Sequence, residues 1–291
     1  MKGIVFIDEA GEKGLVRNVQ THRDALIGLM CGLLVSEEPE CLLRSAFKPH
    51  FDKFCAAAPE GAKIHITDAF LPGNEAWAEV ACEVRAVGLS LVDQGNYTII
   101  YDARRLSVVR ESYESKEQLV DAARQNRRSN VRIPERPDSE RVDEQLVQGL
   151  ILKLDAYAQD HNLDSIDLRF DEIDTSLRKC YEGVLREAQS IEATKRQVKG
   201  WDLKEKKRVQ GEIAIQIKAP FSIDVKHIGN LDVAGKKDAL VLLVDIVTNG
   251  LHHHLCSLGP TDPLNAPTSI AEWQMCSRVW GVRDNAVEDC I

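Results

Sequence analysis

The chain has 291 residues, of which 44% are hydrophobic and 29% charged, and its formal net charge is −9. These values are typical of a soluble globular protein that buries a substantial core as one large domain, or as one domain with insertions. The acidic balance argues against a protein that coats nucleic acid by bulk charge. It leaves a nuclease open, because an acidic metal site adds negative charge and basic contacts can be local.

The cellular compartment is indicated by the start of the chain and by its cysteines. Met1 and Lys2 lead into a short apolar stretch that stops at Asp8, so no signal peptide is expected. The later apolar run over 239–247 is too short and too interrupted to span a bilayer. Eight cysteines without a Cys-x-x-Cys pair predict reduced core thiols. We therefore expect a cytoplasmic protein.

The first third of the chain alternates strand and helix patterns. Apolar runs bounded by glycines or acids predict strands, and apolar residues at spacings of three and four predict helices. In chain order we expect a strand over 2–8, a strand over 26–35, a helix over 39–57, an extended piece over 63–66, a helix over 74–91 capped by Asn74, and a strand over 97–101.

Residues 103–142 change in character. They are rich in arginine, contain two prolines and have few large apolar side chains. We interpret this segment as an exposed charged insertion or mobile loop.

The remainder returns to alternating elements, which implies an α/β fold. We expect a helix over 143–161, a strand over 166–170, a helix over 176–193, strands over 213–217 and 221–227, and a helix over 235–258. Residues 1–258 would form one domain. Residues 259–291 would be a C-terminal extension that packs on the body through Trp273 and Trp280.

Three aspartates end or interrupt apolar elements. Asp8 ends the first strand, Asp171 follows the 166–170 strand, and Asp245 lies within an apolar helix. A buried carboxylate needs pairing, neutralisation or a metal ion. Mg²⁺ or Mn²⁺ prefers such hard oxygen ligands, and two ions held by carboxylates can promote phosphodiester hydrolysis. The alternatives are turn or cap chemistry for Asp8 and Asp171, and an ion pair with Arg or Lys for Asp245.

Several neighbours of these aspartates are candidate auxiliary groups. Glu9 and Glu172 point away from Asp8 and Asp171 if the strands stay regular. On the last helix, a polar stripe accompanies Asp245, formed by Asp238, Asn249 and His252. Asp238 could instead cap that helix.

Two histidine positions leave alternatives open. His252 and Cys256 are four residues apart and could bind zinc, although no second ligand pair is apparent. His65 is either a satisfied core or strand-edge histidine or a group that assists catalysis.

Two basic stretches are candidate contacts for a nucleic-acid backbone, although each could be a solvated face. The candidate nucleic-acid-binding residues are Arg104, Arg105, Arg127, Arg128, Lys195, Arg196, Lys199, Lys206, Lys207 and Arg208.

Three short segments resemble motifs of one family. Asp8-Glu9-Ala10-Gly11 resembles the N-terminal Asp-Glu-Ser-Gly signature of a large, mostly prokaryotic domain family of unknown function. The segment 64–68, with His65, resembles that family's His-containing strand, and 243–247, with Asp245, resembles its C-terminal Gln-x-Ala-Asp helix. The resemblance implies a ribonuclease H-like mixed sheet flanked by helices, in which the acids bind metal. By motif it carries over Asp8, Glu9, His65 and Asp245 as site residues.

The chain departs from that pattern at four positions. Ala10 replaces the serine, Lys63 stands where an acid is common, and Leu242 and Val244 replace the Gln and Ala of the helix.

Three functions follow as expectations. The first is a Mg²⁺- or Mn²⁺-dependent nuclease or phosphodiesterase that acts on nucleic acid. The second, motivated by the departures, is an inactive module of the same fold that binds nucleic acid or a protein, in a prokaryotic or phage-defence or mobile-element setting. The third is a hydrolase of a small nucleotide or phosphorylated substrate.

Overall fold

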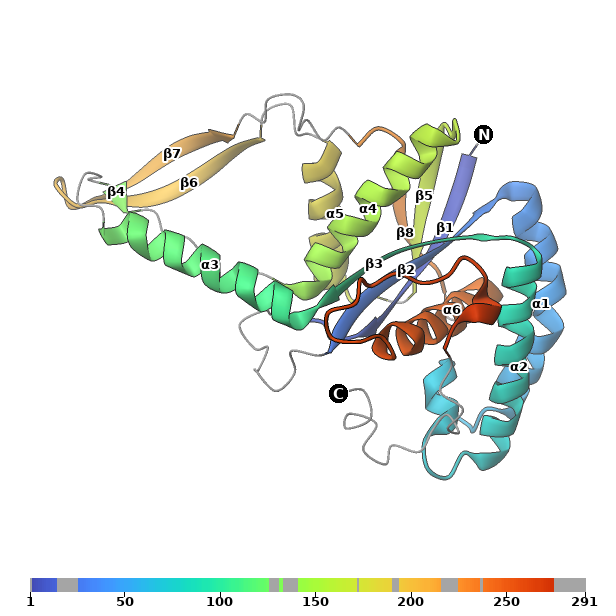
Figure 1. The fold of residues 1–291 in the computed structure, drawn as a ribbon. Coiled ribbons are helices and arrows are strands. Elements are labelled where there is room, and N and C mark those ends of the chain that lie inside the picture. Colours follow the sequence, from blue (N-terminus) through green and yellow to red (C-terminus); the bar gives the residue numbers. More distant parts are fainter. Residues whose placement is uncertain are drawn as a thin grey trace.

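A five-stranded mixed sheet lies at the centre of the computed structural model (Figure 1). The structure describes residues 2–14, 26–125, 131–132, 141–171, 173–189, 194–215, 225–235 and 238–274. The strand order is β3-β2-β1-β5-β8. The strands are β1 (Lys2–Gly11), β2 (Ile27–Ser36), β3 (Thr98–Arg105), β5 (Ser165–Phe170) and β8 (Ile228–Val233).

The directions of the strands place the carboxyl ends of β1 and β5 at the same edge of the sheet. The first three strands form an antiparallel meander, whereas β5 pairs parallel to β1 and β8 pairs parallel to β5. The carboxyl ends of β1 and β5 therefore lie side by side. Nine of the ten residues of β2 are buried, because helices cover both faces of the sheet.

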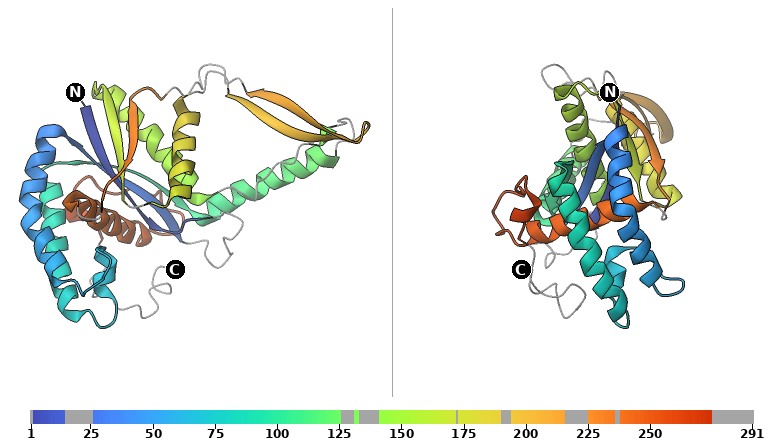
Figure 2. Two further views of the ribbon diagram at one scale, coloured as in Figure 1. Left: turned by 180° about the vertical axis from the view of Figure 1, so that it is seen from behind. Right: turned by 90° about the vertical axis from the view of Figure 1, so that its right-hand side faces the viewer.

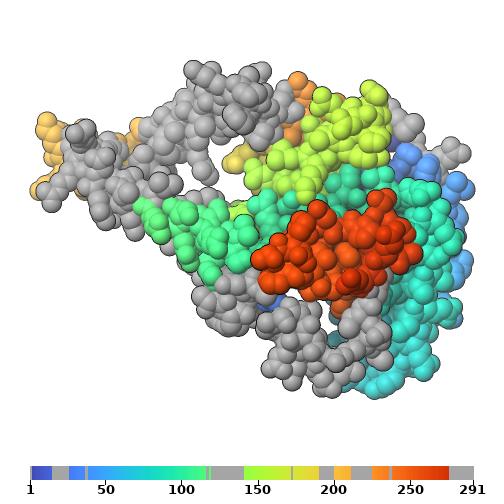
Figure 3. Space-filling model, viewed as in Figure 1, coloured from blue at the N-terminus to red at the C-terminus, as the bar shows by residue number. Residues whose placement is uncertain are grey.

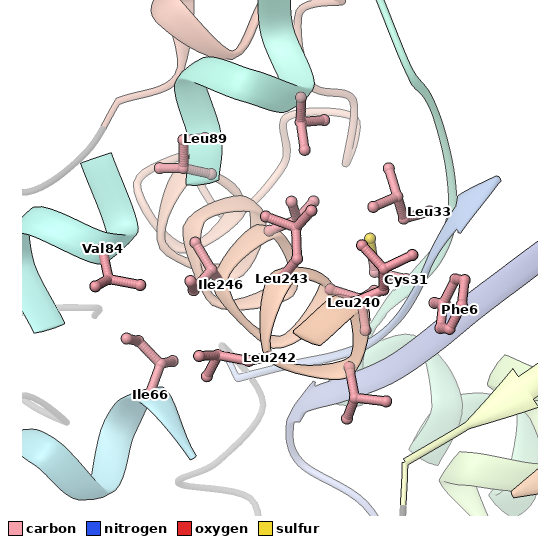
Figure 4. Close-up of a cluster of buried hydrophobic side chains, with 14 of the residues drawn as sticks. Phe6, Cys31, Leu33, Ile66, Val84, Leu89, Leu240, Leu242, Leu243 and Ile246 are labelled. Carbon is pink, nitrogen blue, oxygen red and sulfur yellow. The ribbon is translucent and has the colours of Figure 1, made fainter. Parts of the chain in front are cut away.

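Helix α6 (Ala239–Cys256) packs directly on β1 and β2 and carries the largest run of buried residues. Helices α1 (Glu37–Ala57) and α2 (Glu75–Gln94) pack on its other side. Figure 4 shows the resulting cluster, in which Leu240 and Leu243 of α6 lie among side chains from the sheet and α2. Helix α6 is long and apolar enough to cross a membrane, but 78% of it is buried inside the molecule, as expected of a core helix.

The opposite face of the sheet is covered by α4 (Val142–Asp160) and α5 (Thr175–Gln189). Alternation along β1 serves both layers: Phe6 joins the cluster around α6, whereas Val5 and Ile7 join the cluster around α4.

A second element group projects from this body (Figures 1 and 2). It consists of α3 (Leu106–Gln125) and a three-stranded sheet of order β4-β6-β7. Its strands are β4 (Val131–Arg132), β6 (Thr194–Asp202) and β7 (Lys207–Ile215), with β6 and β7 paired antiparallel.

Helix α3 shows that the loop interpretation of 103–142 was wrong for much of that segment. Leu106, Val109 and Tyr113 are buried at spacings of three and four, so a short apolar face holds an otherwise charged helix against the body. Residues 103–105 extend β3.

Other predicted boundaries also need correction. The extended piece at 63–66 leads into a 3₁₀ helix, Ile66–Phe70. Of the strand predicted over 221–227, residues 225–227 are not strand, since β8 begins at Ile228; residues 221–224 lie outside the described part.

The described part of the C-terminal extension, 259–274, lies on the surface of the body (in red in Figure 3). It buries Ile270 and Trp273 in the α6 cluster. Trp280 lies outside the described residues.

Candidate metal centre

Three side chains from distant parts of the chain converge beside the carboxyl end of β1. Asp8 comes from β1, Asp245 from the middle of α6, and His65 from the residue before the 3₁₀ helix Ile66–Phe70. One potential ligand atom from each lies within 4.8 Å of the other two. Asp8 and Asp245 are only 8% and 4% exposed, whereas His65 is partly exposed.

Strand alternation explains why Asp8, and not Glu9, reaches this group. Asp8 shares a face with Phe6, which packs toward α6. Glu9 points to the other face, where the hydroxyl of Tyr181 on α5 donates to its Oε2 at 3.2 Å and where Lys13 forms an ion pair with it.

Asp245 is held by hydrogen bonds on both carboxylate oxygens. The backbone N–H of Ile66 donates to Oδ2 at 2.7 Å, and Asn249 Nδ2 donates to Oδ1 at 2.6 Å. His65 Nε2 lies 3.4 Å from the same Oδ1. Among the described residues, no Arg or Lys pairs with Asp245, so the alternative of a structural guanidinium or ammonium partner is not supported there.

Asp8 differs from Asp245 because one of its oxygens is left over. Its Oδ2 is buried and has no hydrogen-bond partner among the described residues. A buried carboxylate oxygen without a partner is costly. A divalent cation bound between Asp8 and Asp245 would satisfy it, so the donor set fits a hard metal ion.

The electrostatics of the pair point the same way. Burial, together with the charges of Glu9 and Asp171, raises the pKa of Asp8 to about 7. Burial and the charge of Asp8 raise the pKa of Asp245 well above its usual range. Two close carboxylates therefore retain a proton near neutrality unless a cation stabilises their charge.

His65 is suited to offer a neutral nitrogen. Burial is the largest influence on it and lowers its pKa. Its Nδ1 lies 2.7 Å from Thr67 Oγ1, which orients the ring and leaves Nε2 toward Asp245.

A pocket of about 130 Å³ opens next to the group. Its wall combines acids with two lysines, Lys13 and Lys63. The full lining is Ile7, Asp8, Glu9, Lys13, Met30, Lys63, His65, Phe170, Asp171 and Ile173.

Asp171, predicted as a metal ligand, lies on this wall and outside the three-residue group. It follows β5, its backbone N–H donates to Ile7 O at 3.3 Å, and its charge raises the pKa of both Asp8 and Asp245. The structure thus brings together two of the three aspartates predicted as metal ligands and places His65, predicted only to assist catalysis, beside them.

The predicted polar stripe on α6 divides between two locations. Asn249 contacts Asp245, as described. Asp238 is the N-cap: it accepts from Leu240 N at 2.9 Å, pairs with Arg44, and lies about 10 Å along the helix from Asp245. Its auxiliary role at the site was therefore wrong.

His252 is also displaced from the site. Its Nε2 lies 3.3 Å from the carbonyl of Ile27 and 3.6 Å from Cys256 Sγ, and burial lowers its pKa. Within the described part of the chain this His–Cys pair belongs to no larger group that could hold a metal ion. Glu172 lies outside the described residues.

The arginines at the end of β3 have structural partners. Arg104 pairs with Asp102 and donates to Gln145, whereas Arg105 donates to the carbonyls of Gly259 and Asp262. These contacts tie β3 to α4 and to the C-terminal extension, so we do not assign the two arginines to nucleic-acid binding.

The other candidate nucleic-acid contacts separate into two sets. Lys206, Lys207 and Arg208 are exposed on the β6–β7 hairpin. Arg127 and Arg128, and the side chains of Lys195, Arg196 and Lys199, lie outside the described part of the structure.

Sequence reasoning assigned neither the two pocket lysines nor the N–H of Ile66 to the site, although it noted Lys63 as a departure from the family motif. Lys63 stands two residues before His65, and this spacing places both on one side of an extended segment. That signal was available, whereas the contact between Ile66 and Asp245 required the tertiary structure.

Comparison with known proteins finds no family model that matches this chain and no curated protein significantly similar to it. The functional argument therefore depends on the chemistry of the site itself.

Proposed function

We propose that the protein is a Mg²⁺- or Mn²⁺-dependent nuclease of ribonuclease H-like fold, cytoplasmic and acting on nucleic acid. The observation that carries this proposal is the unpartnered, buried Asp8 Oδ2 within the group of Asp8, His65 and Asp245, beside an open pocket. The mixed sheet with helices on both faces is compatible with a ribonuclease H-like arrangement.

The roles of the residues follow from their contacts. Asp8 and Asp245 would hold the ion with Nε2 of His65, while Asn249 and the Ile66 N–H keep Asp245 in place. A bound divalent ion would supply an activated water and stabilise charge on the leaving oxygen. Glu9 and Asp171 would orient water or assist a second ion at the pocket wall.

The two lysines favour a phosphate-containing substrate. Lys13 and Lys63 place positive charge on the rim of an otherwise acidic pocket. They would attract a phosphodiester and offset its repulsion from the carboxylates.

Pocket size favours a polymer backbone over a small nucleotide. Sites that enclose a small molecule usually have volumes of about 300–1,000 Å³. The pocket of about 130 Å³ has room for an ion, waters and one phosphate group.

A cleavage assay tests the proposal. Single-stranded and duplex DNA and RNA would be incubated with the protein in Mg²⁺, Mn²⁺ or EDTA. We expect metal-dependent cleavage that Asp8→Asn and Asp245→Asn each reduce about 100-fold or more. Asp52→Asn, an exposed change on α1, is the matched control and should cleave like the wild type. Undiminished cleavage by either site variant would remove that residue from the mechanism.

A second candidate is an inactive module that binds nucleic acid or a protein. Leu242 and Val244, which depart from the family pattern just before Asp245, are buried core residues here and add no polar support to the site. Calorimetric titration separates the two proposals, because an inactive module would bind no divalent metal at millimolar concentration.

A further inference from the structure

The tip of the β6–β7 hairpin carries a basic and aromatic surface on an acidic protein. Trp201 and Leu203 are 43% and 56% exposed there, two of the few large apolar side chains exposed on the described part of the chain. Four exposed cations surround them: Lys204, Lys206, Lys207 and Arg208. This surface is positively charged, whereas the formal net charge of the whole chain is −9.

Local interactions fix the shape of the tip. Asp202 Oδ1 accepts from the backbone N–H groups of Lys204 and Glu205 at 2.9 and 3.0 Å, and Lys206 adopts a left-handed conformation with φ of 50°. Strand β4 pairs with Trp201 and Asp202 on the outer edge. These local contacts define the conformation of the tip.

The tip also stands clear of the protein body. The ribbon of β6 and β7 extends away from the five-stranded sheet in Figure 1 and in the left view of Figure 2, and its end protrudes at the far left of Figure 3. Trp201 lies directly opposite Arg208 in the antiparallel register, so the indole and a guanidinium share one face.

We propose that this tip binds single-stranded nucleic acid, with Trp201 stacking on an unpaired base and Lys206, Lys207 and Arg208 contacting the flanking phosphates. Stacking platforms next to cations are how proteins hold single strands without sequence preference. This inference rests on the proposed function only for its substrate class.

Charge and composition favour a single strand over other occupants. An indole that stacks needs an exposed base face, which a continuous duplex does not present. A membrane surface fits less well, because the apolar part is one Trp and one Leu, and two acids, Asp202 and Glu205, lie in the same segment.

Fluorescence anisotropy with the full chain in EDTA tests the inference. The probes are a labelled 20-mer of oligo-dT and a labelled blunt duplex of the same length. We expect the wild type to prefer the single strand, Trp201→Ala to weaken its binding about tenfold, and Trp201→Phe to keep most of the affinity.

A double lysine variant tests the charge. Lys206→Ala/Lys207→Ala should weaken binding and lower the slope of log K against log salt by about 1.4, since each phosphate contact on a single strand contributes about 0.7. Lys48→Ala/Lys53→Ala removes two exposed lysines from α1, which lies at the opposite end of the molecule (Figure 1), and should bind like the wild type.

The outcomes are decisive in both directions. No binding by the wild type, equal loss in the α1 control, or binding by Trp201→Ala within twofold of wild type would each overturn the inference. So would a preference for anionic vesicles that Trp201→Ala abolishes. Hairpin-dependent binding without metal-dependent cleavage would sustain the inference and count against the proposed nuclease, whereas cleavage with unaffected binding by the hairpin variants would do the reverse.

Discussion

Asp8 and Asp245 face each other where β1 packs on α6, yet only Asp245 has hydrogen-bond donors for both carboxylate oxygens. The hydrogen bonds to Asp245 hold its carboxylate in one position. Asp8 Oδ2, by contrast, is buried without a hydrogen-bond partner among the described residues. If the proposed metal site is right, this asymmetry preorganises the pair to bind a divalent cation.

Divalent metal should stabilise the folded protein. Mg²⁺ or Mn²⁺ at about 100 times its Kd contributes about 2.7 kcal/mol, so we expect Tm to rise by about 5 °C. Asp8→Asn should raise the Tm of the metal-free protein, because it removes a buried charge, and should abolish the metal-induced shift. Thermal unfolding followed by circular dichroism, with Asp52→Asn as control, measures both. A metal shift that persists in Asp8→Asn would argue against this site.

The metal-free protein should lose stability as pH rises from about 4 to about 7. The unfolded Asp8 carboxyl ionises near its ordinary pKa of 3.8, whereas the folded one ionises only at about 7. Between these values the unfolded state binds fewer protons, so the free energy of unfolding declines with pH, by at most about 4 kcal/mol from this group. Urea unfolding in EDTA across this range should show the decline, and Asp8→Asn should make it smaller, with the remainder due to Asp245. A flat profile for the wild type would contradict the buried pair.

Loss of the His65 ring should weaken metal binding more than loss of its support. We expect His65→Ala to reduce the affinity for Mn²⁺ at least about tenfold, because it removes one of the three converging ligand atoms. Thr67→Val removes only the hydroxyl beside Nδ1 and should have a smaller effect. Isothermal titration calorimetry measures the Mn²⁺ affinity of both variants. Wild-type affinity in both would show that His65 is not a metal ligand.

A pair of glycine substitutions tests the packing of α4 on β3. A Cβ added at Gly149 would lie 2.4 Å from the carboxyl group of Asp102, which pairs with Arg104 and Lys153. We expect Gly149→Ala to cost about 1–3 kcal/mol.

The matched control is Gly183→Ala on α5, where an added Cβ meets nothing within 4 Å. Because alanine favours helix, this variant should be about 0.5–1 kcal/mol more stable than the wild type. Chemical denaturation measures both variants, and equal effects would contradict the close approach at Asp102.

Helices and strands were predicted accurately from the sequence where the hydrophobic pattern was regular and long. The apolar helix around Asp245 and the first two strands occur close to their expected positions, because their patterns are long and uninterrupted. Helix α3 was missed because only Leu106, Val109 and Tyr113 mark its buried face among many charges.

The site was only partly predictable for a geometric reason. Local patterns marked Asp8 and Asp245 as acids in apolar surroundings, which indicates an unusual environment wherever they lie. They did not reveal that a loop would place His65 closer to the pair than Asp171, since that depends on how the 3₁₀ helix Ile66–Phe70 docks on α6.

The placement of the two carboxylates on β1 and α6 has a consequence during biosynthesis. A ribosome releases Asp8 early and α6 late, so Asp8 and Asp245 come together only when that helix has docked on the sheet. For the nuclease proposed above, this order of synthesis would prevent the nascent chain from cleaving the messenger and ribosomal RNA around it until folding is nearly finished.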